Sequence, residues 1–200
     1  MKKLMFLSAV ILLLSSFKPE AGYKVGDKAI DFSLKNVDDK MMSLADLKDA
    51  KGYIIVFTCN HCPFSIKYED RINALDKKYK KLGYPVVAIN PNDASQHGSD
   101  DFEGMKTRAK EKKFSFPYLH DESQAIATAY GAARTPHVYI VERGAAGNTV
   151  KYIGAIDDNS DNAKQVKEKY VENAVDALLA GKAVSPDFTK AIGCTIKWKK

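Results

Sequence analysis

The sequence predicts an α/β domain with a mixed central sheet, helices on both faces and an N-terminal β-hairpin. An apolar strand pattern, an amphipathic helix pattern and a second apolar strand pattern follow one another, and this order implies parallel pairing. A later pair of strand patterns, separated by Gly144 and Gly147, adds an antiparallel edge. The chain has 200 residues, 45% hydrophobic and 28% charged, which is typical of a globular domain.

The first elements surround a polar turn. Residues 30–34 and 41–44 have strand character, and the polar segment 36–40 between them indicates a hairpin. Ser43 is a suitable N-cap for a short helical turn over 44–47. We therefore expect the chain to enter the main sheet through this hairpin.

A β-α-β unit follows. Residues 53–58 are β-branched and aromatic, which predicts a strand buried on both faces. From 64 to 82, apolar residues recur at steps of three and four, so we expect a long helix that ends at Gly83. Residues 85–90 form the second buried strand of the unit.

The remaining elements are shorter. Further helices are predicted over 100–114, 123–130 and 166–178, and further strands over 137–141 and 149–153. The segment 182–200 has no clear period. We expect one domain over 22–181 and a C-terminal tail over 182–200 that packs on it.

The first 21 residues have the layout of a secretory signal peptide. Two lysines follow Met1, residues 4–14 form an apolar run, and small residues come next. The apolar run is shorter than the ~20 residues that span a bilayer. We therefore expect segment 1–21 to be removed, no membrane attachment afterwards, and a periplasmic or secreted protein.

The net charge of +6 does not by itself indicate a polyanionic partner. Part of the excess lies in segment 1–21, and most other lysines alternate with acids in helical stretches such as 106–113. Because this pattern is typical of a solvated helix face, we expect no nucleic-acid partner.

A Cys-x-x-Cys motif lies where the buried strand ends and the long helix begins. The N-terminus of a helix presents unpaired N–H groups and partial positive charge, which favour a thiolate, the nucleophile of disulfide exchange. We expect Cys59 to be the exposed attacking thiol and Cys62, a turn inside the helix, to be the resolving thiol. His61 between them is expected to stabilise the thiolate. Pro63 suits the first helical turn.

Two other interpretations of these cysteines are a static disulfide and half of a zinc site. A zinc site needs four ligands, and the sequence has no second close pair of cysteines or histidines. Redox chemistry is therefore favoured over a metal site, and we expect no bound cofactor or metal.

The dipeptide Thr135-Pro136 precedes the strand 137–141. A proline can simply open a strand. The functional alternative is a cis-proline beside the dithiol, where the Thr135 backbone pairs with a substrate strand.

These features resemble the thioredoxin fold, and the segments 31–34 and 43–47 resemble the N-terminal hairpin of the redoxin group that contains alkyl hydroperoxide reductase and thiol-specific antioxidant. More narrowly, the chain resembles a peroxiredoxin-like subgroup of bacterial thioredoxin-family proteins. Four segments carry that resemblance, namely Thr58-Cys59-Asn60-His61-Cys62-Pro63, Arg134-Thr135-Pro136-His137, Gly154-Ala155-Ile156-Asp157-Asp158-Asn159 and Gly193-Cys194-Thr195-Ile196-Lys197-Trp198.

The resemblance implies an exported thiol–disulfide oxidoreductase with a role in redox homeostasis. Its partners would be protein thiols and disulfides, with electrons exchanged with a membrane or periplasmic protein. One alternative is an antioxidant thiol peroxidase, in which Arg134 polarises the peroxide bond. A less favoured alternative is a copper-binding chaperone that uses Cys59, Cys62 and His137, since soft thiolates suit Cu(I).

Cys194 has two interpretations. It can be a small buried thiol in a tail that packs through Ile192, Ile196 and Trp198. It can also be a third redox thiol that accepts the disulfide from the motif. Packing is favoured, because no sequence signal brings the tail to the dithiol.

Overall fold

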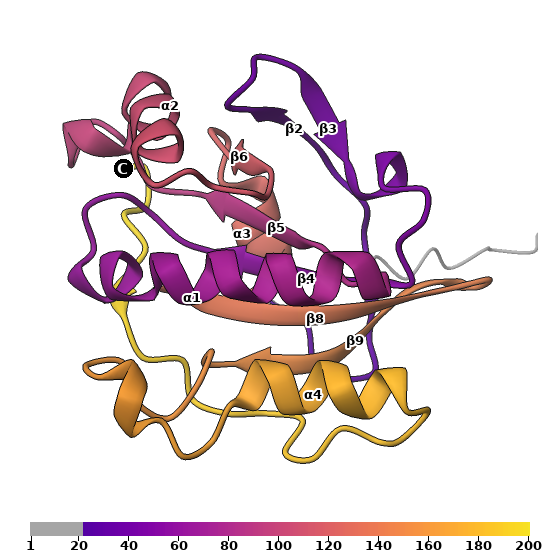
Figure 1. Cartoon of the computed structure of the whole chain (residues 1–200). Coiled ribbons are helices and arrows are strands. Elements are labelled where there is room, and N and C mark those ends of the chain that lie inside the picture. Colours follow the sequence, from indigo (N-terminus) through magenta and orange to yellow (C-terminus); the bar gives the residue numbers. More distant parts are fainter. Residues whose placement is uncertain (1–21) are drawn as a thin grey trace, which may run out of the picture.

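An eight-stranded mixed sheet forms the centre of the computed structural model, which describes residues 22–200 (Figure 1). The predicted signal peptide over 1–21 lies outside the described residues. The strand order is β1-β9-β8-β4-β5-β6-β2-β3. The strands are β1 (Lys28–Ala29), β2 (Ser33–Asn36), β3 (Met41–Ser43), β4 (Gly52–Phe57), β5 (Val86–Asn90), β6 (Tyr118–His120), β8 (His137–Gly144) and β9 (Gly147–Gly154).

The predicted mixed sheet and hairpin are confirmed. β4, β5 and β6 are parallel, and the other neighbouring pairs are antiparallel, including the β2–β3 hairpin. A separate two-stranded sheet pairs β7 (Arg134–Thr135) with β10 (Cys194–Thr195). The sequence predicted none of β1, β6, β7 and β10, because strands of two or three residues are too short to show a period.

Helices cover both faces of the sheet. α1 (Pro63–Tyr79), α2 (Phe102–Glu111) and α4 (Tyr170–Leu179) pack on one face, and α3 (Ala125–Tyr130) on the other. Short 3-10 turns are η1 (Leu44–Asp46), η2 (Lys80–Leu82), η3 (Gly98–Asp100) and η4 (Ala163–Gln165). The fold is thioredoxin-like, as expected.

β4 lies at the centre of both cores. All six of its residues are buried, and alternate side chains enter opposite faces. Ile54 and Val56 pack with α1 and α4, while Ile55 and Phe57 pack with α3. The strand is therefore held from both sides, and the loop that follows it starts from a fixed point.

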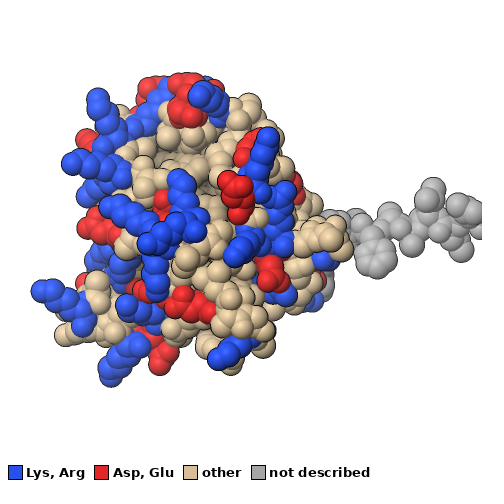
Figure 2. Space-filling model, turned by 45° about the vertical axis from the view of Figure 1, so that its right-hand side comes forward, with Lys and Arg blue, Asp and Glu red and all other residues tan. Residues whose placement is uncertain are grey.

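The surface carries charges of both signs. On the face drawn in Figure 2, Lys and Arg side chains are interspersed with Asp and Glu. Within residues 22–200, no helix combines the length and apolar character needed to cross a membrane.

Candidate active site

The two motif cysteines lie in the loop between β4 and α1, but in places that differ from those predicted. The helix begins at Pro63, so Cys62 is its N-cap rather than a residue one turn inside. Cys59 lies three residues earlier and is 3% exposed, so the expectation of an exposed Cys59 is wrong; Cys62 is 0% exposed, so burial does not distinguish the two thiols. The physical argument for a thiolate at the helix start therefore applies to Cys62.

The Thr135–Pro136 peptide is cis and lies against both motif sulfurs. Cys59 Sγ is 3.2 Å from Thr135 Oγ1, and Cys62 Sγ is 3.1 Å from the Thr135 carbonyl oxygen. Thr135 is fully buried. The structure therefore brings together the dithiol and the dipeptide that the sequence singled out.

The C-terminal tail lies on the other side of Thr135. β10 pairs antiparallel with β7, so that Cys194 is opposite Thr135, and Cys62 Sγ is 2.7 Å from Cys194 Sγ. The sequence had no signal for this proximity. Ile196 is 3% exposed and packs into the core, whereas Ile192 and Trp198 are 48% and 40% exposed. The predicted tail packing thus holds for Ile196 but is wrong for the other two.

The pKa values of the three neighbouring thiols are shifted in different directions, downward for Cys62 and upward for Cys59 and Cys194. Hydrogen bonding by the Cys59 thiol, and then by the Cys194 thiol and the backbone N–H groups of Ser65 and Cys194, lowers the pKa of Cys62 to about 4 against the opposing effect of burial. The hydrogen bond with Cys62, burial and the charge of Asp100 raise the pKa of Cys59. Burial and the interaction with Cys62 raise the pKa of Cys194 to about 11. These shifts make Cys62 the first of the three thiols to lose its proton as the pH rises.

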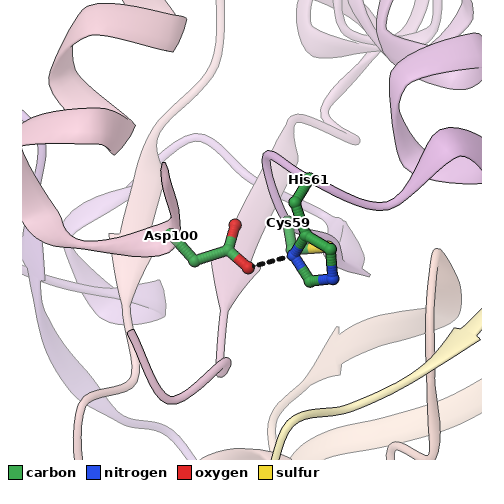
Figure 3. A group of neighbouring side chains, drawn as sticks. All are labelled: Cys59, His61 and Asp100. Atoms are coloured by element: carbon green, nitrogen blue, oxygen red, sulfur yellow. Dashed lines mark hydrogen bonds and ion pairs between the residues drawn. The ribbon is translucent and has the colours of Figure 1, made fainter. Parts of the chain in front are cut away.

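Asp100 is a site residue that the sequence analysis missed. It is fully buried, accepts hydrogen bonds from the Asn60 N–H at 2.7 Å and from Asn92 Nδ2 at 2.9 Å, and contacts His61 Nδ1 (Figure 3). The His61 ring also stacks on His97, with ring centres 4.1 Å apart. Asp100 thus holds in place the loop 58–62 between β4 and α1, which we call the redox loop.

A topological signal could have located Asp100. It lies in the segment that follows β5, and the loops after two neighbouring parallel strands meet at one edge of the sheet. The sequence analysis instead placed Asp100 at the start of a helix over 100–114. The helix α2 begins at Phe102, with Asp101 as its N-cap.

Arg134 and His137, the residues expected for the peroxidase and copper-binding alternatives, make hydrogen bonds to the backbone. Arg134 donates to the Gly193 carbonyl oxygen at 2.9 Å, so its guanidinium binds the tail. His137 accepts from the Ala133 N–H at 3.4 Å and lies against the Tyr139 ring. Burial, and to a smaller extent the charge of Arg134, lowers the pKa of His137 to about 4.

One described group has the donor atoms of a metal site. These atoms, from Cys59, His61 and Asp100, lie within 4.8 Å of one another, and His137 is not among them. The copper ligand set expected from the sequence is therefore not assembled. In the observed group, the Asp100 carboxylate already accepts three N–H donors, including His61, so its oxygens are committed to holding the loop.

The family model "AhpC/TSA family" matches residues 25–150, more than half of the chain and all of β4, α1 and the dithiol. The chain belongs to the AhpC/TSA family. A solved structure of an uncharacterized conserved protein from Geobacillus kaustophilus is 40% identical, with a TM-score of 0.81, and the match covers 90% of this chain and 95% of that one.

Two further comparisons concern redox proteins. "Thiol-disulfide oxidoreductase ResA" of Bacillus cereus is 22% identical to this chain over 180 residues. The match covers 85% of this chain and 95% of the relative. The crystal structure of a putative thiol:disulfide interchange protein DsbE from Chlorobium tepidum has a TM-score of 0.59 at 22% identity, covering 78% of this chain and 98% of that one. This last comparison shows a similarity of fold alone.

Proposed function

We propose that this AhpC/TSA family member is an exported thiol–disulfide oxidoreductase in which Cys62 attacks and Cys59 resolves. The family and the dithiol together support an oxidoreductase activity. The observation that carries the proposal is the place of Cys62 at the helix N-cap, with its Sγ 3.1 Å from the Thr135 carbonyl oxygen of the cis Thr135–Pro136 peptide. The lowered pKa of Cys62 agrees with this position. These roles reverse the assignment expected from the sequence, because Cys62 is the N-cap of the helix and not a residue one turn inside it.

The reaction uses only sulfur chemistry. The Cys62 thiolate attacks one sulfur of a substrate disulfide, whose other sulfur leaves as a thiolate and takes up a proton. The Cys59 thiol then loses its proton and attacks Cys62 Sγ, which forms the Cys59–Cys62 disulfide and releases the second substrate thiol. The substrate is reduced by two electrons and the dithiol is oxidised; the reverse sequence oxidises a substrate dithiol.

The partners follow from this chemistry. Protein thiols and disulfides are the proposed substrates, and a membrane or periplasmic redox protein would restore the starting state. Export is proposed from the signal-peptide layout of segment 1–21. His61, whose ring nitrogens lie near Cys59 Sγ and Asp100, positions the loop between the two thiols.

Trapping of a mixed disulfide tests the roles. Two matched variants each keep one motif cysteine, Cys59→Ser/Cys194→Ser and Cys62→Ser/Cys194→Ser. With oxidised glutathione, the first should form a glutathione adduct at Cys62 at neutral pH, and the second should react far more slowly, as intact-mass spectrometry would measure. Faster adduct formation at Cys59 would overturn the assignment.

The direction of electron flow is tested by the reduction potential of the Cys59–Cys62 couple. A potential near the thioredoxin value of about −270 mV means a reductase, and one near about −120 mV means an oxidant. Equilibration with glutathione buffers of known ratio would measure it.

A further inference from the structure

We propose that Cys194 is a third redox thiol, and that the C-terminal tail, paired with β7 through β10, is a built-in substrate of Cys62. This inference rests on the proposed function, because it needs Cys62 to take part in disulfide exchange. It also goes beyond that function, since Cys59 and Cys62 already form a chemically complete pair.

The tail is seated where a substrate strand would pair. β10 forms antiparallel backbone pairs with β7, Cys194 with Thr135 and Thr195 with Arg134. This is strand addition beside the cis Thr135–Pro136 peptide, the mode by which an extended peptide joins a sheet edge. The residue placed opposite Thr135 is a cysteine, and its sulfur is 2.7 Å from Cys62 Sγ.

Gly193 permits this close approach. A Cβ atom at this position would lie 2.2 Å from the Thr135 carbonyl oxygen, so a larger residue would push the tail away from β7. The Gly193 carbonyl oxygen in turn accepts from Arg134. The lack of a side chain at Gly193 and its hydrogen bond with Arg134 thus both allow the tail to lie close to β7.

The residues after Cys194 anchor the tail to the domain. The Ile196 N–H donates to Ala133 at 3.2 Å, the Lys197 N–H donates to Asn92 Oδ1 at 2.9 Å, and the Asp93 N–H donates to the Lys197 carbonyl at 2.8 Å. The Ile196 side chain is buried in the core. Cys194 is thus held at Cys62 by contacts on both of its flanks. It keeps partial exposure, through which a partner could reach it.

The exchange conserves atoms and electrons. In the oxidised protein with a Cys59–Cys62 disulfide, Cys194 loses its proton and attacks Cys62 Sγ. The Cys62–Cys194 bond forms, the Cys59–Cys62 bond breaks, and Cys59 leaves as a thiolate that takes up the proton. No net oxidation occurs, so the disulfide moves from the buried loop to the tail and joins β10 covalently to Cys62.

Disulfide mapping tests this relay in the full chain without segment 1–21. Oxidised glutathione is added to the reduced wild type and to three variants, Cys59→Ser, Cys62→Ser and Cys194→Ser. Each protein is then alkylated in acid, digested and analysed by mass spectrometry. We expect both Cys59–Cys62 and Cys62–Cys194 in the wild type, only Cys62–Cys194 in Cys59→Ser, and neither in Cys62→Ser. A Cys59→Ser protein that gives only the glutathione adduct of Cys62 would overturn the relay.

A matched pair of tail variants tests whether docking causes the reaction. In the Cys59→Ser background, Ile196→Ala should slow Cys62–Cys194 formation at least severalfold, while Ile192→Ala, at an exposed position of the same tail, should leave the rate unchanged. Equal rates for both would show that the bridge does not depend on the docked tail and would overturn the inference. Circular dichroism establishes that each variant is folded.

Failure of the relay and failure of the proposed function give different results. If the wild type forms Cys59–Cys62 but Cys59→Ser never forms Cys62–Cys194, only the role of Cys194 is wrong. If no cysteine of the wild type reacts with oxidised glutathione, the proposed exchange activity itself is wrong.

Discussion

Two buried carboxylates, Asp100 and Asp157, occupy different regions and are hydrogen-bonded in similar ways. Asp100 accepts from the backbone of Asn60, from Asn92 and from His61 at the redox loop. Asp157 accepts from Tyr68 Oη at 2.7 Å, Arg71 at 2.6 Å and the Asn159 N–H at 3.0 Å.

The surroundings of the two carboxylates differ. Asp157 ties α1 to the loop after β9 and lines a pocket of about 360 Å³ that contains no cysteine, with Arg71, Ala74, Leu75, Lys78, Ile156, Ala163, Val166, Lys169 and Glu172. Asp100 lies beside Cys59 and raises its pKa. Each buried carboxylate accepts three hydrogen bonds and so holds neighbouring segments in place. Only Asp100 lies near a cysteine, so only its charge also alters the pKa of a thiol.

The largest expected difference between the two regions is in activity. Cys62→Ser removes the proposed nucleophile and should lower disulfide exchange by on the order of 10³-fold or more, because the pKa values of the remaining thiols, Cys59 and Cys194, are raised and leave little thiolate to attack the substrate. Asp157→Asn should leave the exchange rate per folded molecule unchanged. Reduction of a fluorescent model disulfide would measure both, and a comparable loss in the two variants would remove the distinction between the regions.

The next largest effect is on stability. Asp100→Ala and Asp157→Ala each leave buried donors unpaired, so each should lower the free energy of unfolding by about 3–5 kcal/mol. Only Asp100→Ala should also lower the pKa of Cys59, since it removes the nearby negative charge. Denaturant unfolding gives the first quantity, and titration of thiolate ultraviolet absorbance gives the second. An unchanged Cys59 titration would make Asp100 a purely structural residue.

The tail gives an intermediate effect. Ile196→Ala removes a buried side chain and should lower the free energy of unfolding by about 2–4 kcal/mol. Ile192→Ala, at an exposed position of the tail, should change it by less than about 0.5 kcal/mol. Thermal unfolding of the reduced proteins compares the two, and equal losses would contradict the seating of Ile196 in the core.

The smallest effect is on the titration of Cys62. With its pKa near 4, Cys62 is a thiolate at neutral pH and loses this charge only as the pH falls through about 4. Cys194→Ala removes the side chain whose hydrogen bond with Cys62 lowers the pKa of Cys62, so it should raise that pKa, whereas Cys194→Ser keeps a hydroxyl that can hydrogen-bond and should raise it less. Thiolate absorbance against pH measures the midpoint, with Cys62→Ser as the blank. Identical midpoints in all three proteins would show that Cys194 does not stabilise the thiolate.

Local features of the sequence were sufficient to predict the frame of the site. The buried strand β4, the long helix α1 and the cysteines between them were predicted, because periods of two and 3.6 residues are visible along a single segment. The cis form of Thr135–Pro136 and its place beside the dithiol were also anticipated as the functional alternative. Cys62 was expected one turn inside the helix, whereas it is the N-cap residue, and that error led to Cys59 rather than Cys62 being placed at the helix start.

The sequence by itself thus determined the α/β class, the strand–dithiol–helix junction and the candidate thiols. Only the tertiary structure decided which thiol caps the helix, that Asp100 holds the loop, and that Cys194 meets Cys62 across 132 positions of the chain. The physical reason is the range of the interactions. Periodicity and helix propensity act between neighbours, whereas the β7–β10 pairing and the Asp100 hydrogen bonds join segments that the folded sheet alone brings to one edge.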